Sequence, residues 1–135
     1  MNETLSRSSL GKAEPGSSLN LELPVRANGH LGGHIVQGHI DGVGTIAATR
    51  EDGIALVVTV SAGPELLRYV AEKGSIAVDG VSLTVASVDD AGFDVWLIPE
   101  TTQRTNLGTA EPGRTVNLEV DILAKYVERL LSTTK

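Results

Sequence analysis

Two hydroxyl-bearing side chains stand two residues apart in a strand-like stretch of this sequence. Residues 81–85 alternate apolar and polar positions directly after Asp79-Gly80, a dipeptide that favours a two-residue hairpin turn. The alternation places Ser82 and Thr84 on one face, with their Cα positions about 7 Å apart by strand geometry. Such a pair can hydrogen-bond a planar heterocycle. The plainer alternative is a solvated strand face, with the nearby Lys73 as an ordinary surface charge.

Three histidines, His30, His34 and His39, stand in a glycine-rich stretch. Imidazole is a common metal ligand and titrates near neutral pH, so it suits either metal binding or proton transfer. A zinc site needs three or four ligands, and no carboxylate stands at a fixed spacing that would complete one here. Residues 32–39 are strand-like, so no helical face aligns the rings. We therefore favour structural or substrate-contacting histidines and predict no metal site.

A third group of polar residues follows a predicted strand at residues 97–102. The strand runs into Pro99 and then into a polar turn, where backbone groups are free to bind a ligand. The alternative is an ordinary strand end. The sequence shows no phosphate loop, no Ser-His-Asp order and no dinucleotide fingerprint. Spacing alone therefore indicates a barrel with a polar patch.

Short strands with turns about every ten residues would hold these groups in place. This pattern predicts a closed or nearly closed antiparallel barrel of six strands, an all-β fold. We predict helical segments at 63–71 and 100–107, a helical turn around 4–10, a linker at 26–34 and a further strand at 18–25. The predicted barrel strands are 35–47, 54–60, 75–78, 81–88, 93–98 and 115–121.

The last segment, 122–131, has apolar residues at helical spacing and predicts an amphipathic helix. Its apolar stripe could pack on the chain's own barrel, which the pattern by itself favours, or against other copies of the chain.

Composition limits the classes of function. The chain has 135 residues, 41% of them hydrophobic and 21% charged, which is typical of a soluble globular protein with one ordinary domain. A net charge of −6 argues against nucleic-acid binding, which relies on Lys and Arg. There is no cysteine, so this chain forms no disulfide. No apolar run is long enough to span a bilayer, and we expect a cytoplasmic protein that does not bind membranes.

The sequence also repeats itself. Residues 3–22 match residues 100–119 at a constant offset of 97, with 12 of 20 positions identical. The second copy follows about a hundred strand-like residues and the first follows two, so we expect the tail of one repeat followed by one whole repeat.

Five motifs together give the sequence a specific family resemblance. They are GGHIVQGHIDG (32–42), EKGSIAVDGVSLTV (72–85), LIPETTQRTNLG (97–108), PGRTVNLEVD (112–121) and AKYVERLL (124–131). In this order and spacing they resemble the riboflavin synthase family of lumazine-binding repeats. The resemblance implies two six-stranded Greek-key barrels and a C-terminal helix that assembles a trimer. Residues 1–23 would be the remnant of a first barrel, 24–121 the second barrel, and 122–135 the oligomerisation helix and tail.

The resemblance also implies a reaction and a site. Two molecules of 6,7-dimethyl-8-ribityllumazine exchange a four-carbon unit, giving riboflavin and 5-amino-6-ribitylaminouracil, without a metal or redox cofactor. His39 and Thr84 would be candidates for proton transfer, and Ser82 would help to hold the ring and the nucleophile that adds to it. The implied substrate-binding residues are Gly38, His39, Ile40, Lys73, Ser82, Leu83, Thr84, Ile98, Pro99, Glu100, Thr101 and Thr102.

Two other functions stay open at this stage. A single barrel could bind lumazine or riboflavin without turnover, or the chain could be a structural oligomer built through residues 122–131. The family's own first barrel, with its Gly-and-hydroxyl pocket, is largely absent from this sequence. We therefore expect one lumazine for each second barrel, and the activity of this chain alone is a separate question.

Overall fold

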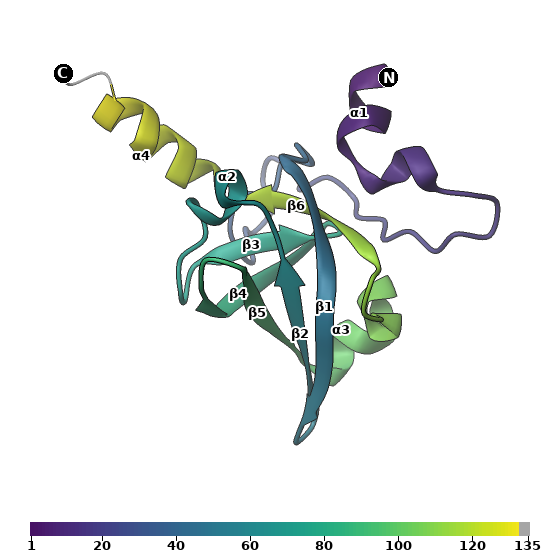
Figure 1. The fold of residues 1–135 in the computed structure, drawn as a ribbon. Coiled ribbons are helices and arrows are strands. Elements are labelled where there is room, and N and C mark those ends of the chain that lie inside the picture. The colour runs from purple at the N-terminus through teal and green to yellow at the C-terminus, as the bar shows by residue number, and fades with distance from the viewer. Residues whose placement is uncertain (133–135) are drawn as a thin grey trace.

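Six antiparallel strands close into a barrel in a computed structural model that describes residues 1–132 (Figure 1). The strands are β1 (Gly42–Asp52), β2 (Ala55–Ser61), β3 (Ser75–Val78), β4 (Val81–Val88), β5 (Gly92–Leu97) and β6 (Thr115–Val120). Their order around the barrel is β1-β2-β5-β4-β3-β6. Because β6 returns to lie beside β3 after the β3-β4-β5 meander, the connection is a Greek key. The predicted six-stranded closed barrel is confirmed.

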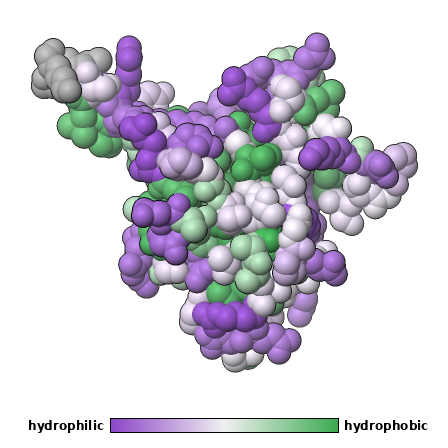
Figure 2. All heavy atoms as spheres, viewed as in Figure 1, coloured by the Kyte–Doolittle hydropathy of each residue, from purple (hydrophilic) through white to green (hydrophobic). Residues whose placement is uncertain are grey.

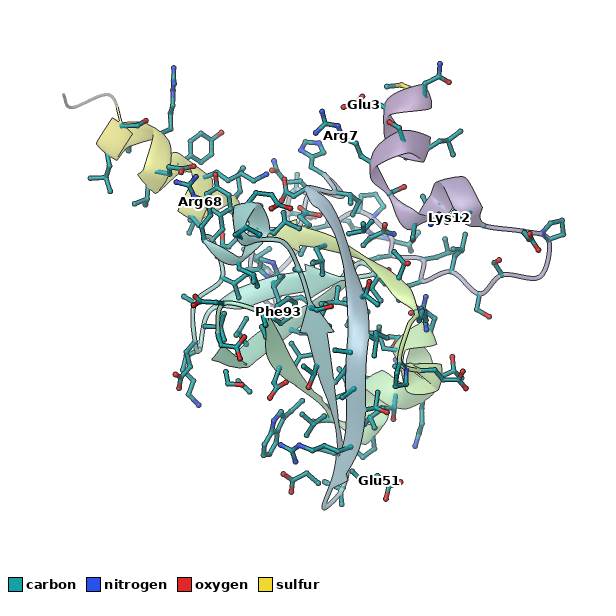
Figure 3. The ribbon with its side chains drawn as sticks, in the orientation of Figure 1. Glu3, Arg7, Lys12, Glu51, Arg68 and Phe93 are labelled. Carbon is teal, nitrogen blue, oxygen red and sulfur yellow. The ribbon has the colours of Figure 1, made fainter. Side chains whose placement is uncertain are left out.

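Alternating side chains form the core of this barrel. Inward positions carry aliphatic residues, with Phe93 as the one aromatic ring among the fully buried side chains of residues 1–132 (Figure 3). The β3–β4 turn is built as its dipeptide predicts, since Asp79 has φ 46° and Gly80 has φ 80°, the positive pair that a type I′ turn requires. The other principal core residues are Ile46, Val58, Val60, Ile76, Val85, Val95, Leu97, Val116 and Leu118.

Short helices cover the ends of the barrel. The helix α2 (Pro64–Leu67) begins at a proline, as predicted, and buries Leu66 and Leu67, but it is shorter than the predicted 63–71. A second helix, α3 (Pro99–Arg104), continues into the 3-10 helix η2 (Asn106–Thr109), which buries Leu107. Strand β1 begins at Gly42 rather than at the predicted residue 35. Residues 35–40 pair with no strand in the described structure, and the Asp41 N–H donates to β6 at the Leu118 carbonyl.

The repeated segments have the same local structure. The helix α1 (Asn2–Arg7) and the 3-10 helix η1 (Ser9–Lys12) match α3 and η2 residue for residue at the 97-residue offset. Both copies carry a Glu–Arg ion pair at the same positions of the helix. In both copies the hydroxyl at the helix junction accepts a hydrogen bond from a backbone N–H two residues later, at 3.3 Å. The repeat is therefore conformational as well as sequential.

The two copies also hold each other reciprocally. The Ser9 N–H donates to Asn117 Oδ1 at 2.6 Å, and the Asn106 N–H donates to Asn20 Oδ1 at 2.7 Å. Ser9 and Asn106 are equivalent positions at the 97-residue offset, and so are Asn20 and Asn117. Contacts of i with j and of j with i are the signature of a two-fold arrangement. Residues 1–20 are thus related to the equivalent residues 98–117 by a pseudo-two-fold arrangement.

The strand predicted at 18–25 is wrong for the described structure. This segment has no assigned strand, and Leu21 and Leu23 are 93% and 88% exposed. Their repeat counterparts on β6, Leu118 and Val120, are buried in the core. The reason is pairing, because a strand requires a neighbour for its backbone N–H and C=O groups and none lies beside residues 18–25.

The helix α4 (Ile122–Ser132) confirms the predicted C-terminal helix, but it does not pack its apolar stripe on the barrel as the pattern favoured. Figure 1 shows it projecting from the barrel on the side away from α1, and Figure 2 shows apolar surface along it. Ion pairs Lys125–Asp41 and Arg68–Glu128 attach its polar side to the barrel. The predicted tail, 133–135, lies outside the described residues. The exposed apolar residues of α4 are Leu123, Tyr126, Val127, Leu130 and Leu131.

Candidate functional site

The hydroxyl pair of β4 lies where the alternation placed it. Strand β4 pairs with β3 through Ser75↔Thr84 and Ala77↔Ser82. Ser82 and Thr84 are exposed on the outer face of the barrel, while Leu83 between them is half-buried. The two hydroxyls therefore point the same way from a rigid strand, so a ligand could contact both.

The linker before β1 crosses this face and contacts Ser82. His34 Nδ1 lies 2.7 Å from Ser82 Oγ, and a Cβ built on Gly33 would lie 3.3 Å from the same oxygen. His34 Nε2 is shielded from solvent and has no hydrogen-bond partner among residues 1–132. The sequence presented His34 as one of three histidines, but it gave no sign of this partner, which lies 48 residues away.

The predicted binding residues at the end of β5 form the first turn of α3. The N–H groups of Thr101 and Thr102 donate to the Ile98 carbonyl at 2.9 and 3.1 Å, and Thr102 Oγ1 donates to the Pro99 carbonyl at 2.9 Å. Ile98 is 58% exposed. These backbone groups are therefore occupied within the helix turn, and exposed side chains such as Ile98 and Glu100 are the ones available to a ligand.

Strand register brings the two groups to the same end of the barrel. The β4–β5 ladder pairs Val85 with Val95 in an antiparallel register, so β4 runs from Val85 back toward Ser82 as β5 runs forward to Ile98. Lys73 joins them from the β3 side, since its N–H donates to the Val85 carbonyl at 2.8 Å. Lys73 is exposed and has φ 65°. The register thus brings the strand positions of Ser82 and Ile98 to the same end of the barrel, and the backbone of Lys73 lies beside β4 at Val85.

Gly38, His39 and Ile40 line a different hollow. Its volume is about 210 Å³, and its other wall comes from the N-terminal repeat, through Glu3, Thr4, Arg7 and Ser8. Figure 3 shows Glu3 and Arg7 on the same helix, α1, close to the upper end of the barrel. The family resemblance had grouped residues 38–40 with residues of β4 and α3. In the structure their neighbours in this hollow belong to α1, the repeat copy of α3.

A buried glutamate holds this part of the linker in place. The N–H groups of Gln37 and Gly38 donate to the two carboxylate oxygens of Glu119 at 2.7 and 3.0 Å, and Glu119 is 4% exposed. A buried carboxylate that accepts from two backbone N–H groups is a fixed anchor for the linker. Nothing in the sequence spacing had singled out Glu119; its burial on β6 is a tertiary feature.

The outer wall of the barrel carries a second hollow, of about 380 Å³. It is lined in part by Thr59, Ser87 and Asp94, and both hydroxyls donate to the Asp94 carboxylate, at 2.6 and 3.1 Å. Sequence reasoning did not point to this surface. Among residues 1–132, no three His, Asp or Glu side chains group so as to hold a metal ion, and no helix is long and apolar enough to cross a membrane.

Comparison with known proteins places the barrel in a family. The lumazine binding domain family matches residues 37–121, which is more than half of the chain. The riboflavin synthase of Actinobacillus pleuropneumoniae is 50% identical over 131 residues, covering 97% of this chain and 61% of that protein. The riboflavin synthase of Mycobacterium bovis is 51% identical over 134 residues, covering 97% of this chain and 67% of that protein. The chain thus spans about three fifths to two thirds of the length of these curated relatives.

Two solved structures of a protein in complex with a small molecule have a similar fold. The crystal structure of LumP complexed with 6,7-dimethyl-8-(1'-D-ribityl) lumazine is similar with a TM-score of 0.79 and 26% identity, covering 89% of this chain and 64% of that one. The complex of LumP with riboflavin gives a TM-score of 0.75 at 26% identity, covering 87% of this chain and 64% of that one. With the family match across β1 to β6 and these relatives, the chain belongs to the lumazine-binding domain family.

Proposed function

We propose that this chain is the substrate-binding and catalytic second half of a riboflavin synthase. The observation that carries the proposal is the 50% identity to a riboflavin synthase over nearly the whole chain, which includes the barrel, the linker and α4. The proposed reaction is the dismutation of two 6,7-dimethyl-8-ribityllumazine molecules to riboflavin and 5-amino-6-ribitylaminouracil. No redox partner is needed, because one lumazine donates the four-carbon unit that the other accepts.

The physical task of the site is to hold two rings against each other. The C7 methyl of the lumazine is acidic because its carbanion is delocalised over the ring, so the substrate itself supplies much of the reactivity. Bringing two such rings together replaces a bimolecular encounter by an oriented one, which is worth on the order of 7–11 kcal/mol in favourable cases. In this proposal Ser82 and Thr84 hydrogen-bond one ring, and Lys73 and the α3 residues complete its surroundings.

His39 lies away from Ser82 and Thr84, and the proposal assigns it a role in proton transfer. It is exposed at the hollow between the linker and α1, and an imidazole, which can both accept and donate a proton, suits proton transfer. Since α1 is the repeat copy of α3, we propose that this hollow is the counterpart of the α3 site in the first repeat. Residues 1–23 would then be the end of a first barrel, as the exposed Leu21 and Leu23 support.

Assembly is part of the same proposal. In the two-barrel arrangement that the resemblance implies, a first barrel meets the second barrel of a neighbouring subunit, and α4 makes the trimer. The exposed apolar side of α4 supports this role, since five large hydrophobic residues of this short helix are between 55% and 71% exposed. A cytoplasmic location also remains a prediction.

The rival function is a binding barrel without turnover. One observation favours it: the named ligands of the LumP structures include lumazine and riboflavin, so the same barrel can hold substrate and product alike. Incubating the purified chain with 6,7-dimethyl-8-ribityllumazine tests both functions. Riboflavin formation, followed by absorbance, supports the enzyme, and saturable fluorescence changes without riboflavin support the binding barrel. The absence of both signals would reject both functions.

A further inference from the structure

We propose that His34 is a positioning residue for Ser82: its imidazole donates a hydrogen bond to Ser82 Oγ and thereby turns the serine hydroxyl proton outward to the ligand. This inference rests on the proposed function in taking Ser82 as a ligand contact. The observation that carries it is the 2.7 Å separation of His34 Nδ1 and Ser82 Oγ, combined with the shielded, unpartnered Nε2 of the same ring.

The two ring nitrogens decide which way the hydrogen bond runs. A neutral imidazole carries one N–H donor and one acceptor nitrogen. If the proton were on Nε2, a buried donor would have no partner, and orphaned donors are rarer than orphaned acceptors. With the proton on Nδ1, the ring donates to Ser82, and the shielded Nε2 is an acceptor without a partner, which costs less than a donor without one. The environment therefore selects the Nδ1-protonated ring.

The consequence falls on the serine. A hydroxyl has one donor and two acceptor lone pairs, so a serine that accepts from His34 keeps its own O–H free. Ser82 lies on the exposed face of β4, and that O–H can then donate to an acceptor atom, such as a carbonyl oxygen or ring nitrogen of a bound heterocycle. The linker is held close to this face by two bonds to the buried Glu119, which limits how far His34 can drift.

The first test needs no ligand. Heteronuclear NMR of the imidazole nitrogens in the full chain should show the Nδ1-protonated form for His34, and Ser82→Ala should shift the His34 signals. His30, exposed in the same linker, is the control, and its signals should not respond to Ser82→Ala. An Nε2-protonated His34, or His34 signals that ignore Ser82→Ala, would overturn the proposal.

The second test measures lumazine binding by fluorescence titration. His34→Leu should raise the Kd about tenfold, close to the effect of Ser82→Ala, because one oriented hydrogen bond is lost. His34→Asn, whose amide N–H can replace Nδ1–H, should restore the Kd to within about threefold of the parent. In a Ser82→Ala background, His34→Leu should add little, since neighbours that act as one unit are not additive. His30→Leu serves as the matched control and should leave the Kd unchanged.

The outcomes distinguish a failure of the proposed function from a failure of the positioning role of His34. If the parent chain binds no lumazine, the proposed function fails, and the NMR result alone decides the His34–Ser82 arrangement. If the chain binds lumazine but His34→Leu is silent, or adds its full effect to Ser82→Ala, the positioning role fails and the proposed function stands. If His34→Asn is as damaging as His34→Leu, the imidazole acts by something other than its Nδ1–H, and the proposal is again rejected.

Discussion

At the scale of single residues, Asp79 shows how one side chain joins distant segments. It occupies the first position of the β3–β4 turn with φ 46°, which Asp tolerates better than most residues. One carboxylate oxygen accepts from the Asn117 N–H at 2.7 Å and the other from Arg114 at 2.8 Å. Its backbone carbonyl accepts from Asn20 Nδ2 at 2.9 Å. The turn is therefore also the point where the N-terminal repeat meets the barrel.

Replacing Asp79 by Ala should lower the free energy of unfolding by about 2 kcal/mol. The change removes the Arg114 ion pair and leaves the Asn117 N–H without its acceptor. Asp79→Asn keeps an acceptor and tolerates the positive φ, so it should cost clearly less. Urea denaturation of the two variants decides the matter. Equal losses would mean that neither the hydrogen-bond acceptor nor the φ preference is what matters at this position.

At the scale of elements, strand β1 depends on a glycine that its neighbours leave no room to replace. A Cβ at Gly44 would lie 2.7 Å from Val60 Cγ1, 2.9 Å from Leu118 Cδ1 and 2.9 Å from the Ser61 carbonyl oxygen. Contacts this short force β1 away from β2 and β6, between which it lies. The glycine thus marks a close approach of three neighbouring strands.

Gly44→Ala should therefore destabilise the barrel by about 2 kcal/mol through overpacking. Gly32→Ala is the matched control, because nothing lies within 4 Å of its added Cβ, and it should change stability by less than about 0.5 kcal/mol. Thermal unfolding followed by circular dichroism measures both. A silent Gly44→Ala would show that the strands can separate at little cost.

The hydrogen bond between Tyr69 and Glu128 predicts that alkaline pH weakens the attachment of α4. Tyr69 Oη donates to Glu128 on α4, and this hydrogen bond, followed by burial and the Glu128 charge, raises the pKa of Tyr69 above its ordinary value of 10.0. Arg68 opposes the rise through its positive charge (Figure 3). A raised pKa in the folded state means that the stabilisation is complete below pH about 10 and is lost as the pH rises through the folded-state value.

Tyr69→Phe should accordingly flatten the alkaline part of the stability profile. The parent should lose thermal stability more steeply than the variant between about pH 9 and pH 11, because the unfolded state releases the Tyr69 proton first. The thermal midpoint measured across this range gives the comparison. Parallel curves for parent and variant would mean that the Tyr69–Glu128 bond contributes nothing to folding.

At the scale of the whole molecule, residues 1–20 form a unit that can detach from the barrel. They reach the barrel through polar contacts such as Asn20 with Asn106 and Ser9 with Asn117, while the barrel has its own hydrophobic core. Asn20→Ala should therefore release the N-terminal segment without unfolding the barrel. Limited proteolysis should show faster cleavage within residues 13–25, and barrel circular dichroism should be retained. If Asn20→Ala also abolished the circular dichroism signal of the barrel, residues 1–20 would be required for the stability of the barrel.

Self-association through α4 is the second prediction at this scale. Val127 is 55% exposed on the apolar side of the helix, and a charge there should prevent apolar burial between copies. Val127→Asp should shift the sedimentation profile toward the monomer. Ile54→Asp is the control, since Ile54 is also exposed, at 84%, but lies in the β1–β2 turn near Glu51, far from α4 in Figure 3. A parent that is already monomeric would contradict assembly through this helix.

The sequence by itself determined the features that arise between neighbouring residues. The type I′ turn at Asp79-Gly80, the outward pair Ser82 and Thr84 and the proline starts of α2 and α3 follow from local φ preferences and strand alternation. The helical turn predicted around 4–10 and the helical segment predicted at 100–107 likewise correspond to α1 and α3. These features need no distant partner, so local pattern suffices.

Only the tertiary structure decided which segments find partners. His34 meets Ser82 across 48 residues, and the buried Glu119 holds the linker across 81 and 82 residues. Residues 18–25 have the pattern of a strand and yet form none, because no strand lies beside them. The apolar stripe of α4 is exposed because Asp41, Arg68 and Tyr69 bind the other side of the helix. Pairing and burial depend on what lies next to a segment in space, which a one-dimensional pattern does not specify.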